Sequence, residues 1–283
     1  MPEDVPVPKL PLFRALRPAE LEQLLGAWEV RSVAESQPAI EEGAEGRDAF
    51  VVVRGSLRAE RRLGEETVVL AVLGPGALFG EMALVSDAPR AASVIAEEPV
   101  QLLAASRDAL EELAKKTPKI GEQLGEFCRA RMVSNLMRHS PLLRAVAPED
   151  RATLMARFTS RAFKAGEKLV ALGAEPDGLF LIASGGVRVV GRDADGDELQ
   201  IAVLGPGDVV GEISVVLRRP ATADVVATHR TVALELTRAE LQGAIKEHPA
   251  LLAELYDLAT KREEEMRTVV AQEALDVEAM VLL

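Results

Sequence analysis

The sequence predicts a mixed α+β protein, mostly β, with two tandem copies of one strand-rich unit. Helices flank each copy, and a long helix ends the chain. Three observations support this class. Between Trp28 and about Leu103, short runs of β-branched and apolar residues are separated by glycine, as in strands joined by turns. Helical periodicity precedes and follows this stretch. The same order of patterns then recurs about 130 residues further along the chain.

The internal repeat covers nearly the whole chain. A helix-like start, a strand led by phenylalanine, a Leu-Gly-Pro-Gly turn and a Gly-Glu pair occur twice in the same order. The first residues of these motifs, in the first and second copy, are Phe13 and Leu143, Phe50 and Phe180, Leu73 and Leu204, and Gly80 and Gly211. This recurrence predicts a duplicated domain, and 283 residues are enough for about two domains.

Four segments follow from these patterns. They are a proline-rich N-terminal arm over residues 1–11, a first domain over 12–140, a second domain over 141–262 and a C-terminal helical extension over 263–283. The prolines of the arm favour an extended backbone over a helix. The boundary between the domains is placed at the Ser140-Pro141 break, because a helix usually ends before a proline.

The elements of the first copy follow in order. The segment PAELEQLLG, which begins at Pro18, has leucines on one face and predicts an amphipathic helix. Strand-like runs such as FVVVRGSLRAERR and ETVVLAVLGPGALFG come next. Helices return at SRDALEELAKK, where Ser106 is the expected N-cap, and continue to about His139. From Ala250, apolar residues recur at threes and fours toward the apolar end MVLL.

Composition excludes several classes of protein. The net charge of −12 argues against a nucleic-acid surface and against an anionic membrane surface, because both partners need a basic patch. No apolar run approaches the ~20 residues of a membrane span. The acidic, proline-rich start does not resemble a signal peptide. The single cysteine, Cys128, makes no intrachain disulfide and is expected to be a small buried hydrophobe. We expect a soluble cytoplasmic protein.

The sequence offers no catalytic or metal-binding constellation. His139, His229 and His248 are scattered, without metal-ligand spacing to one another or to Cys128. No nucleophile elbow, P-loop or paired-acid motif occurs. The sequence therefore predicts that the protein holds no metal and is not an enzyme.

The most informative stretch is FGEMALVSDAPRAASVIA at residues 79–96. Gly80 has no Cβ and lets the backbone approach a ligand closely. Arg90 offers a planar fork of donors that matches two phosphate oxygens. Glu81 is an acceptor when ionised and suits a hydroxyl group. One phosphate and one ribose hydroxyl describe a nucleotide. The alternative, from the residues alone, is a β-barrel corner with a surface Arg–Glu pair.

FGEMAL followed by PRAAS resembles the phosphate-binding cassette of cyclic-nucleotide-binding domains, as in protein kinase A regulatory subunits and bacterial catabolite activators. The resemblance implies two jelly-roll-like β-rolls with helices folded onto them. It also implies that Arg90 grips the cyclic phosphate and that Glu81 takes the ribose 2′-hydroxyl. The expected ligand-binding residues are Phe79, Gly80, Glu81, Met82, Ala83, Arg90, Ala91 and Ala92.

Two further residues bear on recognition of the base. In the resembling family a lid over the base comes from the helix after the β-roll or from a partner chain, and Phe127 is the aromatic residue on that helix. A core position on the same helix would look identical. The family often has Thr or Ser after the arginine when it prefers cGMP, whereas Ala91 offers no hydroxyl. The resemblance therefore favours cAMP over cGMP as the regulatory ligand.

The second cassette, VVGEISVVLRRPATADVVA, is degenerate. Its matching positions are Gly211, Glu212, Ala221 and Thr222. Ala221 stands where the first copy has Arg90, and a phosphate buried without a cationic partner would be an uncompensated charge. Arg218 or Arg219 could reach the site if the loop were shifted. The default interpretation is that the second domain keeps the fold and has lost the ligand.

Two functions stay open. The leading one is a bacterial-type regulatory protein without a DNA-binding domain. In this interpretation, cAMP in the first domain moves the hinge helices (about residues 107–139) and signals to an unidentified protein partner, with the C-terminal helix as one candidate contact. The alternative is a ligand-free scaffold or adaptor that uses both folds and the apolar tail. A transcription factor is disfavoured, because the segment from Ala250 is acidic whereas a recognition helix should be basic. The sequence leaves homodimerisation open.

Overall fold

The computed structural model describes residues 11–63, 66–84, 86–175, 177–193 and 195–281. The chain divides into two compact units, Met1–Met132 and Val133–Leu283, and each is described by itself. Residues 1–10 of the predicted N-terminal arm and residues 282–283 of the apolar tail lie outside the described part.

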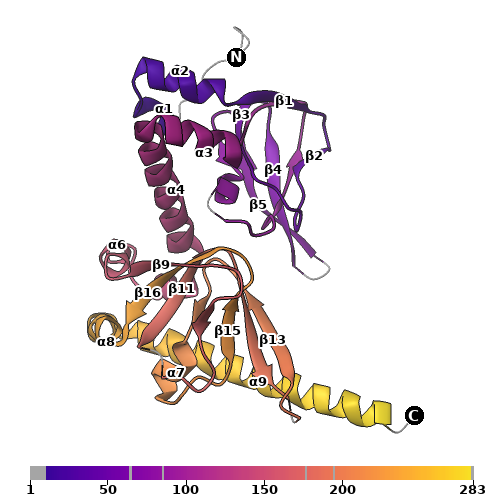
Figure 1. Cartoon of the computed structure of the whole chain (residues 1–283), viewed down its shortest axis with the longest axis vertical. Helices are drawn as coiled ribbons and strands as arrows, with labels where there is room; N and C mark the ends of the chain where they lie inside the picture. Colours follow the sequence, from indigo (N-terminus) through magenta and orange to yellow (C-terminus); the bar gives the residue numbers. More distant parts are fainter. Residues whose placement is uncertain (1–10, 64–65, 85, 176, 194, 282–283) are drawn as a thin grey trace. The chain divides into compact units, whose positions relative to one another are not determined.

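The first unit combines short helices with antiparallel strands (Figure 1). Its helices are α1 (Pro11–Arg14), α2 (Pro18–Gly26), the 3-10 helix η1 (Glu81–Leu84), α3 (Arg107–Lys116) and α4 (Pro118–His139), which continues into the second unit. Its strands are β1 (Glu29–Val33), β2 (Pro38–Ile40), β3 (Asp48–Arg54), β4 (Leu57–Leu63), β5 (Glu66–Leu73), β6 (Leu78–Phe79), β7 (Ser93–Ala96) and β8 (Val100–Ser106). Within the described residues they form two four-stranded sheets, β1-β8-β3-β6 and β2-β7-β4-β5.

An apolar core joins the two sheets of the first unit. Phe50 and Val52 of β3 belong to it, and Phe79 stacks on Phe50 with ring centroids 5.2 Å apart. Val51 and Val53 pack instead into a second cluster with the helices. Successive side chains of a strand point to opposite faces, so β3 is buried on both sides. This explains why its sequence reads as a continuous apolar run.

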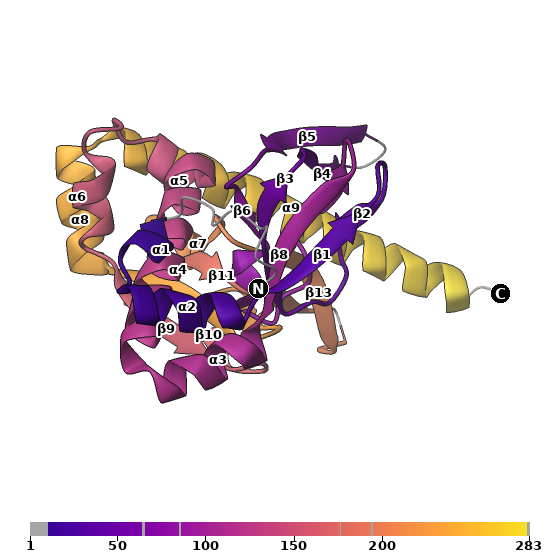
Figure 2. The same cartoon turned by 90° about the horizontal axis from the view of Figure 1, so that it is seen from above.

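Helices cover the outer face of the sheet β1-β8-β3-β6. The cluster on this face contains Leu24 of α2, Leu110 of α3 and Ile120 of α4. Trp28 is buried there and meets Phe13 edge-on, with centroids 6.2 Å apart. Figure 2 shows α2 and α3 side by side, in agreement with their contacts. The helices that flank the strands in sequence therefore complete the core of the same unit.

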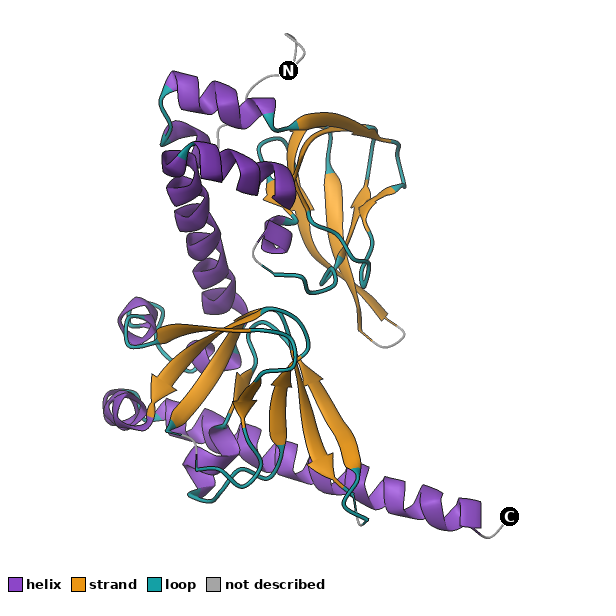
Figure 3. Ribbon diagram, in the orientation of Figure 1, coloured by secondary structure: helices purple, strands orange, loops and turns teal. Residues whose placement is uncertain are grey.

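The second unit repeats the order of the first (Figure 3). Its helices are α5 (Pro141–Arg144), α6 (Arg151–Met155), α7 (Glu212–Leu217), α8 (Arg238–Glu247) and α9 (Ala250–Val281). Its strands are β9 (Thr159–Phe163), β10 (Lys168–Val170), β11 (Gly178–Ser184), β12 (Val187–Arg192), β13 (Glu198–Leu204), β14 (Val209–Val210), β15 (Asp224–Ala227) and β16 (Thr231–Thr237). They form the antiparallel sheets β14-β11-β16-β9 and β10-β15-β12-β13. The predicted α+β class is confirmed, with about 37% helix and 33% strand.

Local capping also repeats between the units. The hydroxyl of Ser106 accepts a hydrogen bond from the N–H of Ala109 at 3.2 Å, which confirms the predicted N-cap of α3. Thr237 does the same for α8 by accepting from the N–H of Glu240 at 3.3 Å. Each cap satisfies a donor that the first turn of a helix cannot pair internally. The helix after β8 and the helix after β16 therefore begin in the same way.

The predicted long C-terminal helix is α9. Leu251, Leu255 and Ala259 recur every four residues and are buried. Figure 1 shows α9 running past α7 and β13, and it contacts both. The side chains from residue 274 onward are not described, so the docking of the apolar end stays a prediction.

Candidate functional site

The predicted cassette of the first unit turns at Gly80, between β6 and η1. Its φ of +71° lies in the left-handed region that glycine tolerates. A Cβ at this position would lie 3.0 Å from both an Arg90 nitrogen and the Asp48 carbonyl oxygen, and 3.1 Å from Ile40. Backbone conformation and lack of space therefore both require glycine here.

The guanidinium of Arg90 lies against this turn. Its Nη1 donates to the carbonyl of Gly80 at 3.0 Å, and its Nη2 donates to the carbonyl of Asp48 at 2.7 Å. A Cβ on Gly46 would come within 2.8 Å of the guanidinium. Burial lowers the pKa of Arg90 from its usual value, while the carboxylates of Asp48 and Glu81 act in the opposite direction. The side chain is thus a partly desolvated cation in a narrow backbone cradle.

Glu81 is the buried acid of the cassette. It opens η1 and is only 5% exposed. The Nε of Arg131, on α4, lies 3.2 Å from its Oε1, and the same guanidinium reaches the carbonyl of Leu78 at 3.5 Å. A carboxylate has about four lone-pair sites, so this pair leaves acceptor capacity on Glu81.

The other predicted residues lie around the same turn. Ala83 is buried, Met82 and Ala92 are half-buried, and Ala91 is exposed. The ring of Phe79 packs in the core between the sheets, so its side chain anchors the start of the turn in that core. The structure therefore brings these residues together with Gly80, Glu81 and Arg90. Their contacts with a ligand stay a prediction.

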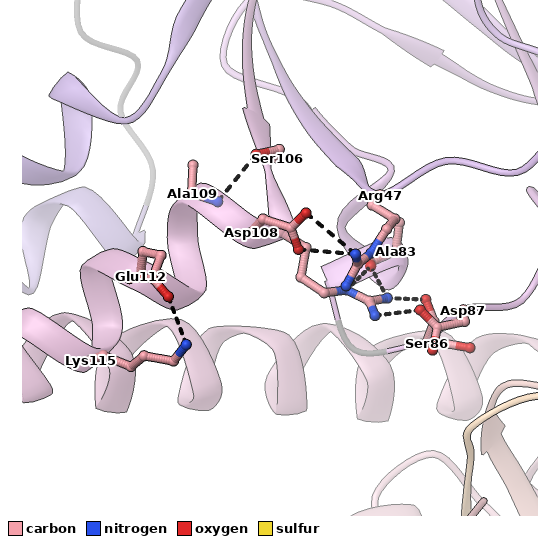
Figure 4. A network of polar contacts seen from close by, with 10 residues as sticks. Arg47, Ala83, Ser86, Asp87, Ser106, Asp108, Ala109, Glu112 and Lys115 are labelled. Atoms are coloured by element: carbon pink, nitrogen blue, oxygen red, sulfur yellow. Dashed lines mark hydrogen bonds and ion pairs between the residues drawn. The ribbon is translucent and has the colours of Figure 1, made fainter.

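Arg107, the first residue of α3, is bonded to Ala83, Ser86 and Asp87 of the cassette, three residues that Figure 4 labels. It is 3% exposed. Its Nε donates to the carbonyl of Ala83 at 2.7 Å, and its Nη2 donates to the carbonyls of Ala83 and Ser86. Its Nη1 pairs with the carboxylate of Asp87. A buried guanidinium thus holds η1 and the following loop to the start of α3.

The second cassette keeps the turn and the buried acid. Gly211 has a φ of +85°, and Glu212 is 2% exposed. Arg262, on α9, donates from Nη1 to Glu212 Oε1 at 2.9 Å and to the carbonyl of Val209. Burial raises the pKa of Glu212, and the charge of Arg262 opposes that rise.

The backbone at Ala221 is held as it is at Arg90. The N–H of Gly173 donates to the carbonyl of Ala221 at 2.8 Å, and the N–H of Ala221 donates to Ala174 at 2.8 Å. In the first unit Arg90 exchanges the corresponding pair with Gly43 and Ala44, at 2.8 and 2.9 Å. Ala221 therefore has the backbone arrangement of Arg90 without its guanidinium.

Neither neighbouring arginine takes over this place. The side chain of Arg219 forms an ion pair with Glu263 of α9 at 3.0 Å. Arg218 is exposed, with a left-handed φ of +50°. Asp224 accepts from the N–H of Leu172 at 2.8 Å and pairs with Lys168 at 2.9 Å. Of the two arginines that a shifted loop could bring to the site, Arg219 is thus already paired with Glu263.

A family comparison decides what these cassettes are. A family model described as "Cyclic nucleotide-binding domain" matches residues 30–117 and 160–248, one match in each unit. The chain belongs to the cyclic nucleotide-binding domain family. The resemblance seen in FGEMAL and PRAAS is confirmed, and the protein carries two of these domains in tandem.

The chain is also similar to individual proteins and solved structures. The chain is 30% identical over 223 residues to "cAMP-dependent protein kinase type II regulatory subunit" of Drosophila melanogaster, covering 79% of this chain and 56% of the relative. It thus spans about half the length of that relative. Among solved structures it is similar to the regulatory domain of Toxoplasma gondii PKA with cAMP (24% identity, 90% and 92% of the chains covered, TM-score 0.41). It is also similar to the Thermus thermophilus catabolite activator protein (27%, 55% and 76%, TM-score 0.40).

The second cyclic nucleotide-binding domain has a pocket of about 650 Å³, counting the space open to solvent. It is lined by Val170, Val189, Ile201, Ala202, Leu204, Val210, Gly211, Glu212, Ile213, Ser214, Ala221, Thr222, Ala223, Val225, Arg262, Glu265 and Met266. All four positions of the predicted degenerate site therefore line one cavity.

The remaining candidates behave as packing residues. Phe127 is half-buried against the helical cluster of the first unit, which agrees with the core alternative for this side chain. Cys128 is buried as expected, and burial raises the pKa of its thiol to about 11. The described residues contain no group of three or more His, Cys, Asp or Glu able to hold a metal ion. Their helices include none long and apolar enough to cross a membrane.

Sequence reasoning missed three arginines of these domains, namely Arg107, Arg131 and Arg262. Arg107 follows its N-cap Ser106, and Arg238 follows the corresponding cap Thr237 at the interval of the repeat. Arg131 and Arg262 had a usable signal, because they are separated by the same interval as Glu81 and Glu212. A duplicated charge at the period of the repeat indicates a duplicated contact.

Proposed function

We propose that the protein is a cyclic nucleotide sensor whose first domain binds cAMP and passes its occupancy to a partner protein. One observation carries the proposal. Arg90 hydrogen-bonds to the Gly80 carbonyl at 3.0 Å, and the residue after Gly80 is the buried acid Glu81. A cation for a phosphate and an acceptor for a hydroxyl thus share one glycine turn, as a cyclic nucleotide requires.

The chemistry of binding follows from the free donors and acceptors. A guanidinium has five N–H donors, and the contacts to Gly80 and Asp48 use two of Arg90's. The other donors are available to the cyclic phosphate. Its negative charge would compensate the charge of the partly desolvated guanidinium. Glu81 keeps lone pairs for the ribose 2′-hydroxyl beside its contact with Arg131. Ala91 has no hydroxyl for the guanine amino group, which favours cAMP over cGMP.

Two arginines offer a route from the ligand to the helices. Arg107 joins η1 to α3, and Arg131 joins Glu81 to α4. A ligand that repositions η1 or competes for Glu81 therefore changes the contacts of both helices. The shift in their equilibrium is set by the ligand's differential affinity for the two arrangements. In this proposal α3 and α4 are the moving elements.

The partner is proposed from the relative's name. The Drosophila relative is called a regulatory subunit of a protein kinase. A kinase catalytic chain is therefore the first partner to test, with α9 as one candidate contact. We propose a regulatory role for the chain and no catalysis of its own.

The test is calorimetric titration of the full chain with cAMP and with cGMP. We expect cAMP to bind at the first domain and to bind more tightly than cGMP. Arg90→Ala should abolish that binding, and Arg90→Lys should weaken it strongly because an ammonium lacks the planar fork. Arg54→Ala is the matched control, since it removes an exposed arginine from the same unit. Undiminished cAMP binding by Arg90→Ala would refute the proposed site.

The second candidate function is a ligand-free scaffold. The observation that favours it is Ala221, which leaves the second cassette without its phosphate-binding side chain. In that case neither cyclic nucleotide binds the wild-type chain at concentrations up to about 1 mM, a free energy near −4 kcal/mol. The same titration therefore separates the two functions.

A further inference from the structure

The pocket of the second unit is formed by β13, the cassette and α9. Ile201 of β13 and Met266 of α9 belong to its mostly apolar lining. Its polar side chains are Glu212 and Ser214 of α7, Thr222, and Arg262 and Glu265 of α9. The loss of the phosphate-binding arginine has therefore not closed the cavity.

The charges of the lining oppose an anionic ligand. Arg262 is the one cation among the described residues that line the pocket, and its guanidinium already binds Glu212 at 2.9 Å and the carbonyl of Val209. It also lies 3.9 Å from Asp208. Glu265 adds a second carboxylate to the lining. A phosphate here would meet two carboxylates and one paired guanidinium, so its charge would stay uncompensated.

The cations next to the pocket are also engaged. Arg219 pairs with Glu263 at 3.0 Å, and Lys168 pairs with Asp224 at 2.9 Å. Ala221, which stands where the first copy has Arg90, is buried and belongs to the cavity lining. Freeing either cation would break an existing ion pair, and in the case of Lys168 would leave a buried carboxylate unpaired.

The hydrogen-bonding groups of the pocket suit hydroxyls. Glu212 has lone pairs beyond the one used by Arg262, and its carboxylate accepts hydrogen bonds. The hydroxyl of Thr222 lines the pocket, and no hydrogen bond occupies it among the described residues. Ser214 adds a second hydroxyl to the lining. Apolar walls with a few polar groups at one turn match a flat base joined to a sugar.

We propose that the second domain binds an uncharged nucleoside in preference to a cyclic nucleotide. Glu212 accepts from the ribose hydroxyls, the apolar wall with Ile201 and Met266 contacts the base, and the methyl group of Ala221 lies where a phosphate would be held. Because α9 supplies Arg262 and Met266, occupancy stabilises α9 against the domain. This site is separate from the one in the first domain and does not depend on cAMP binding there.

The test uses the full chain carrying Arg90→Ala, which removes the first site. Calorimetric titration with adenosine, guanosine, cAMP and cGMP should give one nucleoside bound per chain. That nucleoside should bind at least about tenfold more tightly than its cyclic nucleotide, a difference of 1.4 kcal/mol. Adding Glu212→Gln should weaken it about tenfold or more, because a charged acceptor is lost. Arg218→Ala, which removes an exposed arginine beside the cassette, is the control.

A gain-of-function variant tests the role of the missing charge. Ala221→Arg restores the fork at the phosphate position and should raise cyclic nucleotide affinity of the second site at least about tenfold. Its thermal midpoint is measured first because Ala221 is buried. If it does not fold, the Glu212→Gln and Thr222→Val titrations carry the test.

Three results would overturn the inference. They are no nucleoside binding to the Arg90→Ala chain at about 1 mM, cyclic nucleotide binding to that chain as tight as nucleoside binding, or no gain in a folded Ala221→Arg variant. The proposed function is judged separately, by whether Arg90→Ala abolishes cAMP binding of the otherwise wild-type chain.

Discussion

Arg131 on α4 lies 3.2 Å from the buried carboxylate of Glu81. The second unit repeats this relationship, with Arg262 of α9 at 2.9 Å from Glu212. In both units the acid opens the short helix of the cassette, and the arginine comes from the second helix after the strands, α4 or α9. The turn that is proposed to bind the ribose is therefore also the turn that holds the following helix.

Arg131→Gln should destabilise the first unit. The substitution leaves Glu81 buried without its cation, which costs about 3–5 kcal/mol for a fully buried pair. The Arg131 side chain is 37% exposed, so water compensates part of the loss and we expect about 1–2 kcal/mol. Urea unfolding measures the change. The double variant with Glu81→Gln should regain part of it, and strictly additive losses would contradict a direct pair.

Gly80→Ala should damage both stability and cAMP binding. The left-handed backbone strains alanine by about 1–3 kcal/mol, and the new Cβ meets the Arg90 guanidinium and the Asp48 carbonyl. We expect a lower thermal midpoint and at least about a tenfold loss of cAMP affinity, equivalent to 1.4 kcal/mol. Gly74→Ala is the matched control, because a Cβ there meets nothing within 4 Å. Equal behaviour of the two variants would argue against the cradle.

Arg107→Ala should loosen the cassette. The change removes the buried donor of the Ala83 carbonyl, at about 1–3 kcal/mol for an unsatisfied group, and the buried hydrogen bond to the Ser86 carbonyl. We expect a total loss of about 2–4 kcal/mol in urea unfolding. Arg47→Ala removes an exposed arginine paired with Asp108, and its effect should stay below about 1 kcal/mol. Faster amide hydrogen exchange in η1 for Arg107→Ala alone would link the loss to the cassette.

The buried acid of the second unit should give stability a pH dependence. Burial raises the pKa of Glu212 above its usual value of 4.5, so the folded chain holds this proton to higher pH than the unfolded chain. The wild type should therefore lose stability relative to Glu212→Gln as pH rises from about 4.5 through the raised pKa. Denaturant midpoints measured across the pH series report this difference.

Glu247 serves as the control for that series, because its pKa is shifted in the opposite direction. The hydrogen bond and charge of Arg157 lower the pKa of Glu247, which is an exposed residue. Stability relative to Glu247→Gln should be present above the usual pKa of 4.5 and lost as pH falls through the lowered value. A pH profile of the same sign for both variants would contradict the assigned burial of Glu212.

The sequence by itself determined the duplicated fold and the position of the cassette. Strand alternation, the Ser106 cap and the Gly80 turn depend on neighbours a few residues away, so their patterns can be read locally. The repeat then carries each assignment to the second copy. The loss of arginine at Ala221 was visible for the same reason, since one copy could be compared directly with the other.

Only the tertiary structure decided which charges meet. Arg131 and Glu81 are 50 residues apart in sequence, as are Arg262 and Glu212, and an arginine on a helix reads as solvent-exposed until its partner is placed. The same holds for Arg219, whose ion-pair partner Glu263 lies on α9. Burial and ion pairing depend on which helix packs against which turn. That choice is made by the whole core, and no local pattern contains it.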